Sequence, residues 1–438
     1  MTPVLCAQAR PRATGPTHAS LPPRVANTAA ADLIVRRART RGKTKITESL
    51  GTGTVRICHV VLFGELDGSQ RSMLAICRRL DRRRFEPHVI CQGRGSLTDA
   101  LELDGIPWTA APSLTRSIHP WRDLRGLWQM MVLLRRLAPQ IVHTHSSKVG
   151  FLGRLAARLV GVPVAVHHVR GLPFHEASAP WRRRLFSRLE ALAGAWCDRV
   201  LFVNHEERRL AVDRGLLPES RCVTILNGVE IEAFDGAQVP ALRQSFRHRC
   251  QAVEHEVLIL FCGRLVRQKD PLILPEIARL LEERRPDEPW RIVVAGCGPL
   301  GHQLDERIEQ LGLAKRFLRL GWVADPVPAT VGCDIALLPS RWEGLPRVLL
   351  EAQAAGRPVV TSDITGSREA IDESTGMLCR VGEPADYAAA LDALFDPERR
   401  RCMGDAGRRR ARQRFRVEST VASVVEVYDE LLGPDGPA

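Results

Sequence analysis

Short apolar runs alternate with segments of helical periodicity from residue 55 onward, and the series of runs starts twice along the chain. The first series comprises residues 55–63, 88–91, 140–145, 164–169, 199–203 and 223–226. The second comprises residues 257–262, 291–295, 335–338 and 358–361. Strands that alternate with helices favour a parallel sheet covered by helices on both faces. We therefore predict an α/β protein with two doubly wound, Rossmann-like domains.

The two predicted domains meet in a segment of turn residues and mixed charges, residues 230–256. We place the first domain at residues 55–235 and the second at residues 236–415, which suits domains of roughly 100–200 residues. Two such domains that face each other leave a central cleft. Ligands of doubly wound sheets bind beyond the carboxyl ends of the strands, and the functional motifs of this chain fall at such ends.

Residues 1–54 are rich in Pro, Thr, Ala and Arg and lack periodicity, which predicts a disordered leader. The segment is Arg-rich and acid-poor, as transit peptides are, but it lacks the apolar core of a secretory signal. An alternative hypothesis is that the natural chain starts near Val35 or Val55. The first 50 residues hold nine Lys/Arg against two Asp/Glu, a large share of the net charge of +13.

The basic excess favours an anionic partner, either a phosphate-rich ligand or a membrane surface. We predict no nucleic-acid partner, because aromatic residues are not interleaved with the basic runs and no nucleic-acid motif is present. No stretch approaches the ~18–20 apolar residues of a membrane span. The twelve cysteines lack the paired spacing of zinc or disulfide frameworks, so we predict mostly buried thiols in a reducing cytosol.

The sequence PSRWEGLPRVLLEAQAAGRPVV, which begins at Pro339, follows a predicted strand and carries the strongest functional signal. Glu343 lies in a loop, Gly344 permits close backbone approach, and a helix starts near Pro346. The free N–H groups of that helix form an anion site. Glu351 falls on its second turn, about 8 Å along the axis. The two glutamates can accept hydrogen bonds from two hydroxyl groups of one ligand, or they cap a helix in solvent.

The loop FCGRLVRQKD, residues 261–270, also lies between a predicted strand and a helix. Gly263 opens the turn, and Arg264 and Lys269 can both point at one diphosphate. Arginine supplies a planar fork of donors and lysine a point charge. The alternative is an ordinary solvated loop.

Two glycine-rich turns follow other predicted strands. Residues 295–301, AGCGPLG, match G-x-G-x-x-G and include Gly298. The loop contains a proline, and no acidic residue ends the next strand, so we do not predict a dinucleotide site. Residues 64–76 include Gly68 and either line the cleft or form a tight turn. Asn227 ends the last strand of the first domain, where it makes a turn or faces the cleft.

Histidines gather at two neighbouring strand ends of the first domain: His143, His145, His167 and His168. Histidine is a common metal ligand, but no cluster of Asp, Glu or Cys accompanies these four, and no Asp-x-Asp occurs in the chain. General acid–base chemistry, hydroxyl binding and a structural role remain alternatives.

A helical pattern over residues 181–196 carries one apolar stripe, formed by Trp181, Leu185, Leu189, Leu192 and Trp196. Four arginines lie off the stripe: Arg182, Arg183, Arg184 and Arg188. We expect the stripe to pack on its own domain. Docking on an anionic membrane surface is the alternative.

From residue 55 to residue 432 these motifs together resemble glycosyltransferase family 4, the retaining family with the GT-B fold. The resemblance rests on EGLPRVLLE, GRLVRQKD and AGCGPL, in that family's arrangement, and on HTHSSKVGFLGRLAARLVGVPVAVHHVRGLPFH. It implies that a C-terminal helix, within residues 416–438, crosses back to the first domain.

The resemblance also implies roles for site residues. Arg264 and Lys269 would hold the donor diphosphate, Glu343 the donor sugar and Glu351 the ribose. Further substrate contacts would come from Gly68, His168, Arg170, Asn227, Gly298, Gly344, Leu345 and Pro346. Many relatives carry a histidine where this chain has Arg170, so the contact of that histidine passes to Arg170 or His168. The family needs no metal and no cofactor.

We therefore predict a cytoplasmic, metal-independent, retaining glycosyltransferase with a UDP- or GDP-linked sugar as donor and a glycan or lipid-linked acceptor. Cell-surface polysaccharide assembly is the setting that the family suggests. Peripheral contact with the inner face of the membrane is a further hypothesis. Two alternatives are another nucleotide-sugar reaction on the same fold and a non-catalytic, nucleotide-sugar-binding scaffold.

Overall fold

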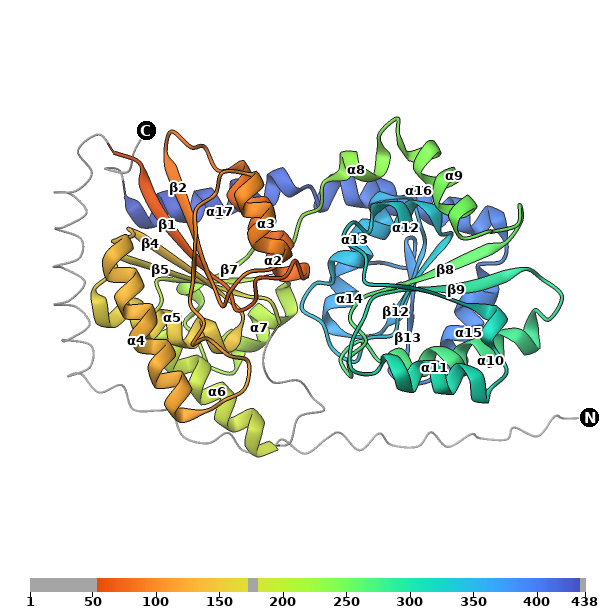
Figure 1. The fold of residues 1–438 in the computed structure, drawn as a ribbon, viewed down its shortest axis with the longest axis horizontal. Coiled ribbons are helices and arrows are strands. Elements are labelled where there is room, and N and C mark those ends of the chain that lie inside the picture. Colours follow the sequence, from red (N-terminus) through yellow and green to blue (C-terminus); the bar gives the residue numbers. More distant parts are fainter. Residues whose placement is uncertain (1–52, 172–179, 434–438) are drawn as a thin grey trace, which may run out of the picture. The chain divides into compact units, whose positions relative to one another are not determined.

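The computed structural model of the protein describes residues 53–171 and 180–433, so the predicted leader lies almost entirely outside the described residues. Figure 1 shows two α/β domains, each built on its own sheet. The strand orders are β3-β2-β1-β4-β5-β6-β7 and β10-β9-β8-β11-β12-β13. The strands of both sheets pair in parallel in the part of the chain that the structure describes, for example Val55 beside Phe85 and Ile335 beside Ile259. The prediction of two doubly wound sheets is confirmed.

The first sheet contains β1 (Val55–Val60), β2 (Phe85–Cys91), β3 (Trp108–Ala110), β4 (Ile141–His145), β5 (Val164–Val169), β6 (Arg199–Phe202) and β7 (Cys222–Thr224). The second contains β8 (Val257–Cys262), β9 (Trp290–Ala295), β10 (Phe317–Gly321), β11 (Ile335–Leu338), β12 (Val359–Ser362) and β13 (Gly376–Cys379). Central strands such as β4 and β11 are buried along their whole length. Parallel strands covered on both faces need such continuous apolar runs.

The helices of the first domain are α2 (Gly68–Arg79), α3 (Ser96–Leu103), α4 (Pro120–Leu137), α5 (Ser147–Val160), α6 (Pro180–Gly194), α7 (His205–Asp213) and the 3₁₀ turn η1 (Glu219–Arg221). The connection and second domain contain α8 (Ile231–Asp235), α9 (Val239–Arg249), η2 (Pro271–Ile273), α10 (Leu274–Arg284), α11 (Gly301–Gln310), η3 (Ala314–Arg316), α12 (Val327–Gly332), α13 (Arg347–Ala354), α14 (Thr365–Ala370), α15 (Pro384–Ala393) and α16 (Pro397–Arg414). The predicted joint is therefore largely helical.

The last helix, α17 (Val417–Leu432), leaves the second domain and packs on the first sheet (Figure 1). Val421 and Val424 share a buried cluster with Ile57 of β1. The crossing starts where the backbone N–H of Val229 donates to Phe415 O at 2.8 Å. Each fully buried large apolar side chain contributes about 1.5–3 kcal/mol, so α17 ties the end of the chain to the first domain.

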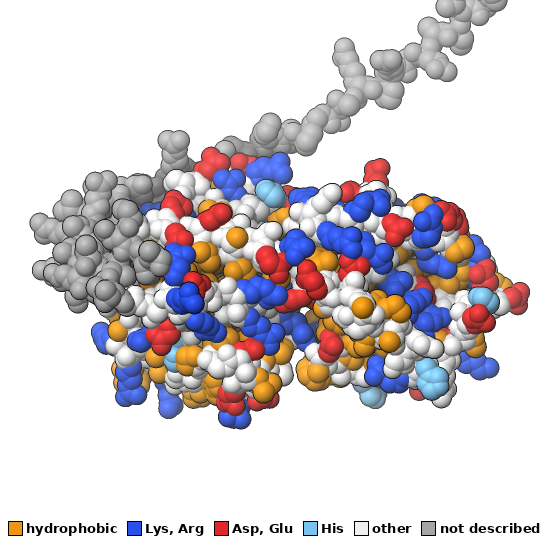
Figure 2. Space-filling model, turned by 90° about the horizontal axis from the view of Figure 1, so that it is seen from above, with side chains coloured by type: hydrophobic (Ala, Val, Ile, Leu, Met, Phe, Trp, Pro, Cys, Tyr) orange, Lys and Arg blue, Asp and Glu red, His pale blue; other side chains and the backbone are white. Residues whose placement is uncertain are grey.

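Basic and acidic side chains are interspersed with small apolar patches on the face seen in Figure 2. None of the helices within residues 53–171 and 180–433 is long and apolar enough to cross a bilayer. Helix α6 differs from its prediction, since Trp181, Leu185 and Leu192 of its apolar stripe are exposed. Ala193 and Gly194 are buried instead. The prediction failed here because helical periodicity identifies an apolar face but not the neighbour that covers it. Of the four arginines, Arg184 and Arg188 are exposed, and the side chains of the other two lie outside the described set.

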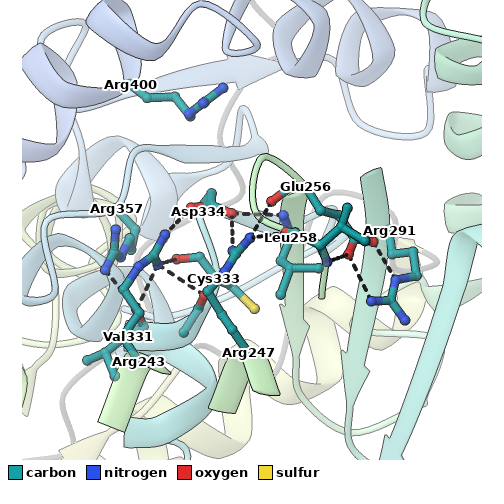
Figure 3. A network of polar contacts seen from close by, with 12 residues as sticks. Arg243, Arg247, Glu256, Leu258, Arg291, Val331, Cys333, Asp334, Arg357 and Arg400 are labelled. Carbon is teal, nitrogen blue, oxygen red and sulfur yellow. Dashed lines mark hydrogen bonds and ion pairs between the residues drawn. The ribbon is translucent and has the colours of Figure 1, made fainter. Parts of the chain in front are cut away.

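At the amino end of the second sheet, Asp334 anchors helix α9 (Figure 3). Its carboxylate accepts hydrogen bonds from Arg243 at 2.6 Å, Arg247 at 3.0 Å and the backbone N–H of Leu258 at 2.9 Å. Burial opposes ionisation of Asp334, but Arg243, Leu258 and Arg247 outweigh it and lower the pKa of the carboxyl group. This network stabilises the fold at the end of the sheet away from the motifs.

Candidate active site

A cavity of about 360 Å³ lies where the carboxyl ends of the two sheets meet. It brings together most of the predicted site residues, namely Gly68, Arg170, Asn227, Arg264, Lys269, Glu343, Gly344, Leu345, Pro346 and Glu351. Residues of both domains therefore line one space. Its position agrees with the general location of ligands in doubly wound sheets.

The loop after β11 is held by side chains of the first domain. Asn204 Nδ2 donates to the Gly344 carbonyl at 2.8 Å, and Asn227 Nδ2 donates to the Leu345 carbonyl at 2.8 Å. A Cβ atom on Gly344 would lie 2.4 Å from the Arg170 carbonyl oxygen. Only glycine therefore fits at residue 344 without moving one domain against the other.

Helix α13 begins directly after this loop, with Pro346 as its N-cap, so its free backbone N–H groups lie at the cavity. Glu351 is 6% exposed and forms an ion pair with Arg347 at 3.3 Å. Arg347 also donates to the Gly228 carbonyl at 2.7 Å. The helix thus offers an anion site and a buried carboxylate within one and a half turns.

Lys269 and Glu343, predicted to hold different parts of one donor, contact each other in this structure. Lys269 Nζ lies 2.6 Å from Glu343 Oε1, and Gln268 Nε2 donates to Glu343 Oε2 at 3.4 Å. Both charged side chains are mostly buried. Arg264 reaches across to the first domain, where its Nε lies 3.6 Å from Asp67 Oδ2. The cations that could bind a diphosphate are therefore paired with carboxylates here.

His168 and Gly298 are the two predicted site residues that do not line the cavity. A Cβ atom on Gly298 would lie 2.4 Å from the Leu265 carbonyl oxygen, so this glycine allows two loops to pack. Its neighbours Gly296 and Cys297 line the cavity instead. His168 is fully buried. A substrate contact for either residue stays a prediction.

Four buried histidines lie side by side at the ends of β1, β4 and β5. The ring centroids of His143 and His145 are 4.4 Å apart, and those of His143 and His168 are 5.6 Å apart. His59 Nδ1 lies 3.2 Å from His145 Nε2, and His143 Nδ1 lies 2.6 Å from the Tyr428 hydroxyl of α17. His59 gives no signal in the sequence, because it is a single polar residue within an apolar strand.

The electrostatics of this cluster favour neutral imidazoles. Burial, reinforced by the charge of Arg170, lowers the pKa of His59 to about 3. Burial also holds the pKa values of His143, His145 and His168 well below their usual range. Burial and then Arg347 lower the pKa of the Arg170 guanidinium to about 9. Arg170 donates to Asn227 Oδ1 at 2.6 Å, which directs it toward the cavity.

Within residues 53–171 and 180–433, one group has the geometry to hold a metal ion, His59, His143 and His145, with ligand atoms within 4.8 Å of one another. The adjacent guanidinium of Arg170, 3.4 Å from His145 Nδ1, would repel a cation there. The chemistry of the cluster therefore fits hydrogen bonding between neutral rings better than metal binding.

Several cavity residues were missed by sequence analysis, among them Asp67, Arg71, Gln268 and Arg347. Arg71 donates to the Ala324 carbonyl of the other domain. Only Arg347 gave a usable signal, because it lies four residues before Glu351 on the same helical face. Gln268 lies in the same loop as Lys269, whereas Asp67 and Arg71 become site residues only when the two domains meet.

Two doubly wound sheets that face each other across one cavity form the GT-B architecture. The family model "Glycosyltransferase Family 4" matches residues 66–233, and "Glycosyl transferases group 1" matches residues 256–396. The chain belongs to the group 1, family 4 glycosyltransferases.

The chain is 30% identical over 384 residues to UDP-Gal:alpha-D-GlcNAc-diphosphoundecaprenol alpha-1,3-galactosyltransferase of Escherichia coli, covering 86% of this chain and 97% of that protein. It is 23% identical to the capsular polysaccharide biosynthesis glycosyltransferase CapM of Staphylococcus aureus, covering 73% and 84% respectively.

Among solved structures, Anabaena HepE in complex with UDP and glucose has the same fold, with a TM-score of 0.73 at 20% identity. That match covers 85% of this chain and 99% of HepE. WaaG, a glycosyltransferase involved in lipopolysaccharide biosynthesis, matches with a TM-score of 0.69 at 15% identity and covers 85% and 99%.

Proposed function

We propose that this enzyme transfers a sugar from a UDP-sugar to a lipid-linked glycan during assembly of a cell-surface polysaccharide. The observation that carries the proposal is the set Arg264, Lys269, Glu343 and Glu351 around one cavity at the start of α13. The Escherichia coli relative, named for a UDP-sugar donor and a diphosphate-linked lipid acceptor, supports both substrate classes. The structure of HepE in complex with UDP and glucose supports uracil as the base of the donor.

The donor diphosphate would occupy the amino end of α13. The helix N–H groups together with Lys269 and Arg264 would stabilise the charge that develops on the departing nucleotide, the main electrostatic demand of the reaction. Lys269 must then release Glu343 before it can bind phosphate, because the same ammonium group forms an ion pair with Glu343, 2.6 Å long, in this structure. Glu343, released from Lys269, can accept a hydrogen bond from a donor-sugar hydroxyl, and Glu351 from a ribose hydroxyl.

We propose that the anomeric configuration of the sugar is retained. Each cavity carboxylate of the described residues lies beside a cation, Asp67 beside Arg264, Glu343 beside Lys269 and Glu351 beside Arg347. A covalent mechanism needs two carboxyl groups that flank the reacting carbon, and with the donor bound as proposed Glu343 contacts a sugar hydroxyl and Glu351 a ribose hydroxyl. The arrangement favours attack from the face that the nucleotide leaves, through an oxocarbenium-like state. Proton coupling at the new anomeric centre, measured by NMR, tests retention.

The same cations support catalysis without a divalent metal or another cofactor, because two side-chain charges and a helix end supply the positive charge that a metal would otherwise bring. Turnover that is unchanged by an excess of chelator is the expected result. Loss of turnover in chelator, restored by a divalent ion, would contradict metal independence.

We further propose that the enzyme works in the cytoplasm at the membrane surface, where a lipid-linked acceptor is held. The test is incubation of the full-length protein with UDP- and GDP-sugars and a short-chain N-acetylglucosaminyl diphosphate lipid. Mass spectrometry should detect acceptor extended by one sugar with a UDP-sugar, and extension slowed by about 10²–10³-fold with Lys269→Ala. Donor hydrolysis alone, or no product with any donor from protein shown to be folded, would overturn the proposed transfer.

A further inference from the structure

Helix α4 exposes a row of large apolar side chains on the first domain. Trp121, Leu124 and Trp128 are 77%, 58% and 64% exposed, and their spacing of three and four residues places them on one face. The opposite face packs into the domain through buried Met130 and Leu134. A soluble helix normally shows polar residues on its outer face, so this row needs a partner.

Arginines surround the row, and acids are absent from it. Between residues 105 and 139 the chain has five arginines, Arg116, Arg122, Arg125, Arg135 and Arg136, all exposed. The one acidic residue of this stretch, Asp123, forms an ion pair with Lys148 at 2.6 Å. The stretch therefore carries a net positive charge beside the apolar row.

Ile118, 72% exposed, extends the apolar row into the loop before α4. We call Ile118, Trp121, Arg122, Leu124, Arg125 and Trp128 the α4 surface. Tryptophan and leucine flanked by arginine is the composition of helices that lie in the headgroup region of a bilayer. The arginine stems can cover apolar surface while their charges reach lipid phosphates.

The α4 surface lies toward the cleft end of the first domain. The chain passes from α4 directly into β4, so α4 runs antiparallel to the strands and its first turns lie at their carboxyl ends (Figure 1). Lys148, at the start of α5, donates to the Thr115 and Ser117 carbonyls and so fixes the loop that precedes α4. A membrane bound here would therefore lie near the cleft end of the domain.

We propose that the α4 surface docks the enzyme on an anionic membrane, with the two tryptophans at the headgroup level, and so presents the cavity to a lipid-borne acceptor. The functional purpose of this docking rests on the proposed transfer to a lipid-linked glycan. The contact itself rests on the exposed row and its charge. Lipid is a better partner than protein for a surface that pairs tryptophans with unopposed arginines on one helix.

The test is co-sedimentation of the full-length protein with vesicles of phosphatidylglycerol and phosphatidylcholine in equal parts, and of phosphatidylcholine alone. Trp121→Ser with Trp128→Ser should lower partitioning into the anionic vesicles by at least about tenfold. The matched control is Leu103→Ser with Leu159→Ser, which changes two side chains, 90% and 53% exposed, on α3 and α5. It should leave partitioning unchanged.

A second pair of variants tests the charge. Arg122→Gln with Arg125→Gln should weaken binding by about fivefold per arginine at low salt, while Arg399→Gln with Arg409→Gln, two exposed arginines of α16, should not. The full chain is used throughout because its basic first 50 residues are then present in every sample. Circular dichroism of each variant verifies folding.

Transfer to the short-chain acceptor separates this proposal from the proposed function. Vesicle binding that depends on the α4 surface, without transfer to any acceptor, would support docking and overturn the proposed transfer. If the enzyme transfers sugar to the short-chain acceptor, and the α4 variants bind vesicles as well as the unchanged protein does, the docking proposal alone is overturned. A dimer that Trp121→Ser with Trp128→Ser converts to a monomer, without vesicle binding, would assign the surface to a second copy and also overturn docking.

Discussion

The two domains share one topology, but the carboxyl ends of their sheets differ in chemistry. In the first domain, the strand ends hold neutral, fully buried imidazoles such as His143 and His168. In the second, they hold the ion-paired Lys269 and Glu343 beside the amino end of α13. A repeated fold therefore places a polar cluster at the same position twice; the buried lysine and glutamate pair their opposite charges, whereas the buried imidazoles have no carboxylate partner among the described residues of the cluster and stay neutral.

This difference assigns separate tasks to the two domains. Asn204 and Asn227 of the first domain hold the loop at Gly344 and Leu345 through amide hydrogen bonds. The second domain supplies the charges that suit a diphosphate. We therefore propose that the first domain positions the donor loop and that the second contacts the donor.

The largest expected effect is acid lability of the first domain. His59, His143, His145, His167 and His168 are buried, and burial holds their pKa values well below the usual 6.5. The unfolded chain binds protons at these sites below pH 6.5 and the folded chain does not. The free energy of unfolding therefore keeps the whole contribution of these histidines above pH 6.5. It falls by about 1.4 kcal/mol per histidine for each pH unit below that value.

At pH 5.5 the five histidines together should lower the free energy of unfolding by about 7 kcal/mol, which is comparable to the total stability of many domains. Calorimetry from pH 8 to pH 5.5 should show an early transition that splits from the rest. Hydrogen exchange should assign that transition to β1, β4 and β5. An unfolding temperature that does not change over this range would contradict the description of the cluster as neutral and buried.

A large effect on catalysis is expected from Lys269→Ala. The substitution removes a cation at the proposed leaving group, so kcat should fall by about 10²–10³-fold at saturating donor. Lys315→Ala, at an exposed position in η3, is the control and should keep full activity. A change in kcat of less than about threefold for Lys269→Ala would show that Lys269 does not stabilise the leaving group.

The network at the opposite end of the second sheet should affect stability and not activity. Asp334→Asn weakens the contacts to Arg243 and Arg247, and the loss should be about 3 kcal/mol in chemical unfolding. The lowered pKa of Asp334 means that its contribution is present at neutral pH and is lost as pH falls below its usual value of 3.8. Asp305→Asn, in a half-exposed pair with Arg319, should cost at most about 1 kcal/mol.

The smallest predicted effect concerns Glu351. Glu351→Gln keeps the shape of the side chain and weakens a charge-assisted hydrogen bond to ribose, so KM for the donor should rise about tenfold with little change in kcat. Steady-state kinetics at varied donor concentration measure this. An unchanged KM would show that Glu351 serves only its ion pair with Arg347.

The fold was predictable because doubly wound sheets need continuous apolar runs, and these survive as local patterns. Strands β5, β8 and β11 have the predicted bounds. The edge strands β3 and β13 were missed because they are short and only partly buried, so neither carries a continuous apolar run. The prediction that the apolar stripe of α6 packs on its own domain was wrong at Trp181, Leu185 and Leu192, because a helical period does not reveal which face a neighbour covers.

The site was predictable where its residues follow one another in sequence, as in the loop from Glu343 to Glu351. Asp67 and Arg71 enter the cavity only because the domains meet. Gly298 shows the converse, since a motif glycine can be required by a packed loop rather than by a ligand. Cys262 and Cys297 also line the cavity, although nothing in their spacing indicates it.

The most direct test of the division between the domains is amide hydrogen exchange of the full-length protein with and without saturating UDP. Strong protection is expected in residues 263–269, 296–299 and 342–351, the three loops of the second domain at the cavity. It predicts weak protection at the strand ends of the first domain, near His145 and His168. Protection confined to the first domain, or none at all in folded protein, would contradict the assignment of donor binding to the second domain.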